Sequence, residues 1–253
     1  MKENRRLVLV LAEPHSREIE VRTGPGDHAN ATVGRRLRGE LIQLGGEPFL
    51  QNVWPDDPRA LGTIRNIGRQ LHRETLERGR RAFRDIRETW PRFALFDQHG
   101  DLFLSESLRG QYVMINFIFS RCLDPVMCPA ATERMRLTQE LARERGIDNL
   151  HFVSITLDPD YDTPGILRAY ADGREIDLAN FSFLTGPADI IEDLKTQMGI
   201  ISRPDPTEIF QHTMSTTLVD PVGRIFFRIP GSSWTPEAFI RQLERHRDAS
   251  AVQ

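Results

Sequence analysis

Two cysteines, Cys122 and Cys128, are the residues of this sequence whose type and spacing most clearly permit chemistry. The chain has no other cysteine, and both lie in one short stretch, FSRCLDPVMCPAAT, with Pro129 directly after the second. Paired thiols can form a structural disulfide, exchange disulfides with another protein, or bind a soft metal ion. The alternative without chemistry is a pair of small core residues.

The position of Cys128 predicts an unusual thiol. Proline is favoured at the first position of a helix, so Pro129 makes Cys128 the expected N-cap residue. The free N–H groups and the positive end of the helix dipole favour a thiolate there, and Arg121 adds a nearby positive charge. We therefore predict a lowered pKa for this thiol.

The elements that must position the cysteines follow an α/β pattern. The apolar run QYVMINFIFS, residues 111–120, is typical of a central strand buried on both faces, and a helix is expected from Pro129 to Arg145. The later runs predict further strands and helices, with Thr163 and Gly199 at helix ends and a closing helix after Thr235. We predict a central mixed sheet with flanking helices, and a strand–Cys-turn-Cys–helix unit of this kind resembles the thioredoxin superfamily.

Two further segments precede this region. Residues 1–56 contain short alternating runs separated by glycine and proline, which predict a small β-rich module. Residues 57–90 have apolar residues at helical spacing, and we expect one long connecting helix with many arginines on its polar face. A solvated face is the favoured interpretation of those arginines, and docking on a membrane surface or an acidic partner is the other. The predicted domains are 1–56, 57–90 and 91–253.

Composition limits the classes of function. The chain has 253 residues, 39% of them hydrophobic, and a net charge of −3, which fits a globular protein and gives no indication of nucleic-acid binding. No apolar run approaches the roughly 20 residues of a membrane-spanning helix. The apolar run Leu7–Ala12 is too short for the core of an export signal.

Three more stretches, together with the cysteine turn, carry a family resemblance. They are SITLDPDYDTPGILRAYAD, FLTGPADIIEDLKTQMGI and QHTMSTTLVDPVGRIFFRIPG. In this order they resemble the SCO/SenC family over Pro91 to Arg247, although the family has three residues between its cysteines and this chain has five. The resemblance implies a thioredoxin-like fold and a copper ion, Cu(I) or Cu(II), on two cysteines and one histidine. The matching residues are Cys122, Cys128 and His212.

The resemblance also implies a function. It indicates a metallochaperone-like protein for assembly of a respiratory copper oxidase, whose partner is a copper-receiving oxidase subunit or another copper or thiol protein. A thiol–disulfide oxidoreductase with Cys122 and Cys128 as the redox pair is the alternative, and a peroxide-reducing thiol enzyme is a weaker one. His212 separates the first two, because copper needs the imidazole and disulfide exchange does not.

Two acidic residues and the cellular location complete the expectations. One of Asp158 and Asp162 either lies in the second shell of the metal site or holds the backbone of the cysteine loop, and the alternative is plain turn and cap chemistry. Turn and cap chemistry is the favoured interpretation for Asp162, and the two interpretations are balanced for Asp158. Family members sit on a membrane through an N-terminal anchor. We therefore expect a periplasmic protein, or one anchored to the membrane and facing the periplasm, with an anchoring segment outside this sequence.

Overall fold

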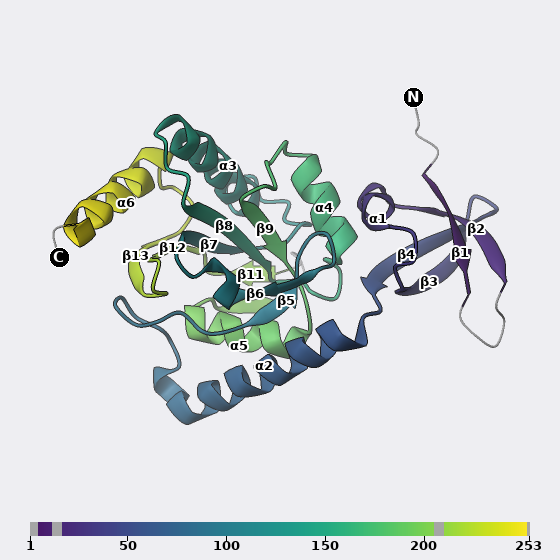
Figure 1. Cartoon of the computed structure of the whole chain (residues 1–253), viewed down its shortest axis with the longest axis horizontal. Helices are drawn as coiled ribbons and strands as arrows, with labels where there is room; N and C mark the ends of the chain where they lie inside the picture. Colours follow the sequence, from purple (N-terminus) through teal and green to yellow (C-terminus); the bar gives the residue numbers. More distant parts are fainter. Residues whose placement is uncertain (1–4, 12–16, 205–209, 252–253) are drawn as a thin grey trace.

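The computed structural model describes residues 5–11, 17–204 and 210–251. Its centre is a five-stranded sheet in the order β13-β12-β7-β8-β9 (Figure 1). The strands are β7 (Tyr112–Ile118), β8 (Leu150–Thr156), β9 (Phe181–Leu184), β12 (Ser215–Val219) and β13 (Ile225–Pro230). The helices that follow or flank them are α3 (Cys128–Glu144), α4 (Pro164–Asp172), α5 (Ala188–Met198) and α6 (Pro236–Ala251).

The sheet is mixed, as predicted. β7, β8 and β9 run parallel, while β12 pairs antiparallel with both β7 and β13. Every residue of β7 is buried, which explains why its sequence is continuously apolar rather than alternating. The cysteine turn leaves the carboxyl end of this central strand and enters α3.

Two predicted helix ends are confirmed. Thr163 is the N-cap of α4, and its hydroxyl accepts a hydrogen bond from the Ile166 amide at 3.4 Å. Gly199 ends α5 with φ of 74°, in the left-handed region that glycine enters without steric cost. These local signals set where α4 and α5 lie in the chain.

Short elements complete this part of the molecule. The hairpin of β5 (Ala94–Phe96) and β6 (Leu102–Leu104) joins the fold through a bridge between Phe96 and Thr185, and a 3-10 turn at Ser105–Leu108 follows it. A second pair consists of β10 (Ser202–Pro204) and β11 (Phe210–His212).

The N-terminal part forms the predicted small β-rich module. Its sheet has the order β1-β2-β4-β3, with a short helix between β2 and β3. A small apolar cluster of Val21, Leu50 and Val53, separate from the main core, lies beneath it. The elements are β1 (Arg6–Val10), β2 (Glu18–Thr23), α1 (Pro25–Asn30), β3 (Leu37–Leu44) and β4 (Glu47–Pro55).

The connecting helix is shorter than predicted. α2 covers Pro58–Arg78, and a 3-10 turn over Gly79–Arg81 follows, so the prediction of a helix reaching residue 90 is wrong. Gly79 has φ of 55°, and beyond it the Arg84 amide bonds the carbonyl of Gln197 at 2.7 Å instead of continuing the helix. α2 packs against α5 and adds Ile64 and Leu71 to the main core.

The N-terminal module contacts the larger part through α1, which lies against α4 (Figure 1). Gly26 and Gly165 approach so closely that a Cβ on either would overlap the other segment. The Asn30 side chain donates to the carbonyl of Gln98 at 2.7 Å, and Arg35 donates to that of Gly100 at 2.6 Å. Within the described residues, no helix combines the length and apolar character needed to cross a bilayer.

Candidate metal centre

The cysteine turn is an ordered loop with several internal bonds. The Cys122 amide donates to the carbonyl of Phe119 at 3.3 Å, and the Val126 amide donates to the Asp124 carboxylate at 2.9 Å. The Met127 amide also returns to the carbonyl of Asp124, at 3.2 Å. On its far side the loop is tied to the rest of the fold, because the Ser232 hydroxyl donates to the carbonyl of Val126 at 2.5 Å.

The two sulfurs lie together but differ in exposure. Both cysteines are in the thiol form, with no disulfide between them; Cys122 is half-buried and Cys128 is 0% exposed. The hydrogen bond with Cys122, together with burial, raises the pKa of the Cys128 thiol. The sequence had predicted a lowered pKa, and this prediction is wrong because the sulfur is buried beside a second thiol rather than exposed to solvent.

Two details explain the correction. α3 begins at Cys128 itself, with Met127 as the N-cap residue, so Cys128 is not the cap. The Arg121 guanidinium donates to Asp158 through Nε at 3.0 Å and Nη2 at 2.5 Å, so its charge is directed at a carboxylate. It also lies over the Tyr161 ring, 4.0 Å from the centroid.

Two of the three acidic residues of LDPDYDTP, Asp158 and Asp162, hold the residues that precede Cys122. Asp158, 5% exposed, is the ion-pair partner of Arg121. Asp162, fully buried, accepts hydrogen bonds from the amide of Ser120 at 3.1 Å, from the Ser120 hydroxyl and from the Thr156 hydroxyl at 2.5 Å. Burial raises the pKa of Asp162, and the bonds from Ser120 and Thr156 oppose this rise. Asp162 therefore does more than serve its own turn.

A buried polar pair lies beneath Cys128, and sequence reasoning missed it. The hydroxyls of Thr132 and Tyr170 lie 3.0 Å apart, and Thr132 is one helical turn after Cys128 on α3. Burial raises the pKa of Tyr170 to about 12, and the hydrogen bond with Thr132 opposes the rise. The i, i+4 spacing of Cys128 and Thr132 was the available signal.

His212 is placed by its backbone only. It is the last residue of β11, where it pairs with Ser202 in an antiparallel register. Its side chain lies outside the described part of the structure. β12 begins shortly afterwards and runs antiparallel to β7, so its first residues lie at the edge of the sheet from which the cysteine turn emerges. Among the side chains that are described, no three histidine, cysteine or acidic groups form a metal-binding cluster.

Comparison with known proteins gives a consistent family. The SCO1/SenC family model matches residues 83–248. A SCO1 protein homolog of Bacillus subtilis is 31% identical over 147 residues, which are 57% of this chain and 75% of that protein. A SCO2-like protein of Rickettsia prowazekii is 31% identical over 138 residues, which are 52% of this chain and 64% of that protein.

Solved structures show the same fold. A SCO1/SenC family lipoprotein from Bacillus anthracis has a TM-score of 0.58 at 29% identity, covering 64% of this chain and 98% of that one. ScoI of Bradyrhizobium japonicum, solved with copper bound, has a TM-score of 0.51 at 26% identity, covering 62% of this chain and 99% of that one. The matched region contains the sheet, the cysteine turn and β11. The chain belongs to the SCO1/SenC family.

Proposed function

We propose that this protein binds one copper ion on Cys122, Cys128 and His212. The observation that carries the proposal is the pair of adjacent thiols at the mouth of β7 and α3. Two thiolates and an imidazole suit Cu(I) and can also hold Cu(II). The Bradyrhizobium japonicum relative with copper bound supports the same cargo here.

The surrounding residues would keep the sulfurs in place. Asp162 and Asp158 fix Ser120 and Arg121, directly before Cys122, and Thr132 with Tyr170 supports the first turn of α3 behind Cys128. We propose Asp158 as an outer support of the metal site, acting through Arg121. A site held from behind in this way needs little reorganisation when the metal enters.

We further propose a role in the assembly of a respiratory copper oxidase. A solved relative, at 26% identity with a TM-score of 0.57, is described as a member of a family of cytochrome c oxidase assembly proteins. The partner would be a copper-receiving oxidase subunit or another copper or thiol protein. Since the Bacillus anthracis relative is a lipoprotein, we propose attachment to a membrane with the site facing the periplasm.

Thiol–disulfide exchange by the same pair is the second candidate. The solved relative just mentioned is described as having a disulfide switch. Attack on a disulfide requires a thiolate that the partner's disulfide can reach, and Cys128, 0% exposed, is closed to such a partner, so the attack would fall to the half-buried Cys122. The buried sulfur is thus better suited to holding a metal ion, which displaces the proton, than to acting as a nucleophile.

Anaerobic copper loading followed by metal analysis tests the proposal. We expect about one copper per wild-type chain, and sharply weaker binding in Cys122→Ser, Cys128→Ser and His212→Ala. His28→Ala, a substitution of an exposed histidine in α1, is the matched control and should bind as wild type. Equal copper retention by the three ligand variants would reject the ligand set. Loss in the cysteine variants alone would exclude His212.

A further inference from the structure

The outward face of α2 and the segment after it carry a set of exposed arginines. Arg69 and Arg73 lie on α2 at helical spacing, on the side opposite the buried Ile64 and Leu71, and Arg80 is exposed in the 3-10 turn that follows the helix. In Figure 1, α5 lies on one side of α2, and the other side of the helix forms an outer edge of the molecule. We use the name arginine ridge for five exposed arginines, Arg69, Arg73, Arg80, Arg81 and Arg87.

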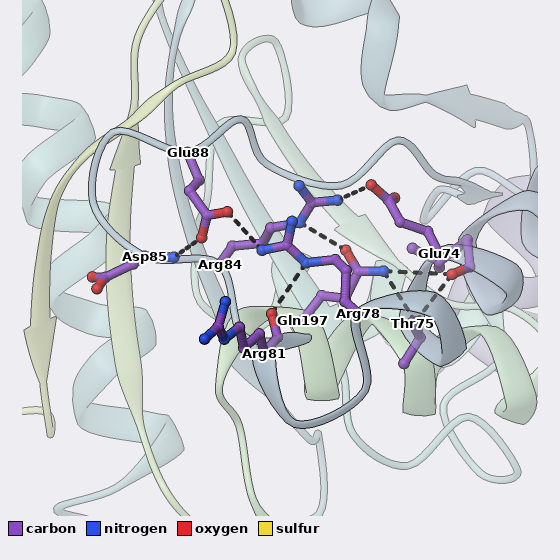
Figure 2. A network of polar contacts seen from close by, with 9 residues as sticks. Glu74, Thr75, Arg78, Arg81, Arg84, Asp85, Glu88 and Gln197 are labelled. Carbon is purple, nitrogen blue, oxygen red and sulfur yellow. Dashed lines mark hydrogen bonds and ion pairs between the residues drawn. The ribbon is translucent and has the colours of Figure 1, made fainter.

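Two carboxylates near this ridge, Glu74 and Glu88, are already paired with arginines outside it. Figure 2 shows buried Arg84, 8% exposed, bonded to Glu74 and, through Nε at 3.0 Å, to Gln197. Arg78 similarly forms an ion pair with Glu88, with 2.6 Å between Nη2 and the carboxylate oxygen. The two ion pairs join α2 to the segment that follows it, and the hydrogen bond from Arg84 to Gln197 joins that segment to α5.

The ridge itself keeps its charge. In the part of the chain that the structure describes, none of its arginines forms an ion pair, and Arg69 bonds only the Asn66 amide oxygen, at 3.3 Å. Glu77 and Asp85 are the exposed carboxylates of the same stretch, and the five ridge arginines outnumber them. The surface is therefore locally positive on a chain whose net charge is −3.

Exposed apolar side chains lie between the arginines. Leu76 is 66% exposed and lies on the same face of α2 as Arg69 and Arg73, and Phe83 and Ile86, in the segment after α2, are 43% and 40% exposed. Apolar side chains interleaved with long cationic ones are the pattern of protein surfaces that rest at the headgroup level of a bilayer.

We infer that the arginine ridge binds the anionic headgroups of a lipid bilayer, with Leu76 and Ile86 entering the interface. This inference stands apart from copper binding, because it uses none of the proposed metal ligands. It assigns α2 a role that the family match over residues 83–248 does not cover. An acidic protein surface is the competing occupant, and the experiment separates the two.

Vesicle sedimentation of the full chain at low salt is the test. The probes are phosphatidylcholine vesicles, and the same vesicles containing phosphatidylglycerol. We expect binding only to the anionic vesicles, weakened by added salt, because screening shortens the range of exposed charges to about 10 Å at 0.1 M. The triple variant Arg69→Gln, Arg73→Gln, Arg80→Gln should lower the partition coefficient by roughly tenfold or more.

Matched variants keep the test specific. A second triple variant, with Arg143, Arg241 and Arg245 each replaced by glutamine, removes the same charge from exposed positions on α3 and α6 and should bind as wild type. Leu76→Ser should weaken binding in a salt-insensitive way. Circular dichroism verifies that each variant is folded.

Two results would overturn the inference. The first is equal loss of vesicle binding in both triple variants, which would mean that only net charge matters. The second is a wild-type chain that does not bind anionic vesicles. If that chain bound immobilised polyglutamate and the ridge variant did not, an acidic protein would be the occupant. Copper loading of every variant should stay unchanged, so this test and that of the metal site can fail independently.

Discussion

Gly165→Ala probes the contact between the N-terminal module and the larger part of the molecule. A Cβ at this position would overlap the Asp27 carboxylate and lie 2.7 Å from the backbone nitrogen of Asp27. Rotation of the Asp27 side chain relieves the first overlap, but only displacement of α1 relieves the second. Overpacking of this kind costs about 1–3 kcal/mol, and we expect the free energy of unfolding to fall by that amount.

Gly62→Ala supplies the control with the opposite sign. Gly62 lies within α2, and a methyl group added there would have no neighbouring atom within 4 Å, so alanine meets open space. Alanine in a helix interior is more stable than glycine by about 0.5–1 kcal/mol, and this variant should gain stability. Urea unfolding followed by circular dichroism measures both variants.

The sign of the Gly165→Ala effect decides the outcome. If this variant were as stable as Gly62→Ala, α1 would not be packed against α4 as described. Hydrogen exchange gives a local measurement, because displacement of α1 should increase exchange over residues 25–35. Adding Asp27→Ala should recover only part of the lost stability, since the overlap with the backbone nitrogen remains.

Three other predictions concern buried polar groups. Burial raises the pKa of Asp27 from 3.8 to about 6, so between these values the folded state holds a proton that the unfolded state has lost. The free energy of unfolding should therefore fall as pH rises from about 4 to about 6. Urea titrations at each pH measure this slope, which Asp27→Asn should remove. Asp162→Ala leaves three donors without their acceptor and should cost about 3 kcal/mol by urea unfolding, whereas exposed Asp160→Ala should cost almost nothing. Arg84→Leu should lower the thermal midpoint by several degrees, consistent with a loss of about 2 kcal/mol, and an unchanged midpoint, as expected for exposed Arg80→Leu, would contradict the ion-pair network.

The fold followed from the sequence wherever local pattern and tertiary packing agree. The continuous apolar run of β7, the Thr163 cap and Gly199 each signalled their element, and each is confirmed. The helix was predicted to continue beyond Arg78 because apolar residues keep helical spacing there. In the structure α2 ends at Arg78, and Phe83 and Ile86 lie outside the helix and are exposed. Periodicity alone does not show that the Arg84 amide finds its acceptor on α5.

The site was predictable in its residues more than in its electrostatics. The turn placed Cys122 and Cys128 at the mouth of a strand and a helix, as expected, but burial and the contact between the sulfurs reverse the predicted shift of the Cys128 pKa. The sequence left Asp158 between a role at the metal site and one in the turn, and it favoured the turn for Asp162, whereas their partners Arg121 and Ser120 come from another strand end. Such pairings depend on the parallel register of β7 and β8.

The unequal depth of the two sulfurs gives the turn a direction. A molecule arriving from solution meets Cys122 before it can reach Cys128, which lies at the start of α3 with none of its surface open. A partner that accepted the proposed copper ion one ligand at a time would therefore replace Cys122 first and Cys128 last. The way in which the strand and the helix bury Cys128 thus sets the order in which an approaching molecule can reach the two sulfurs.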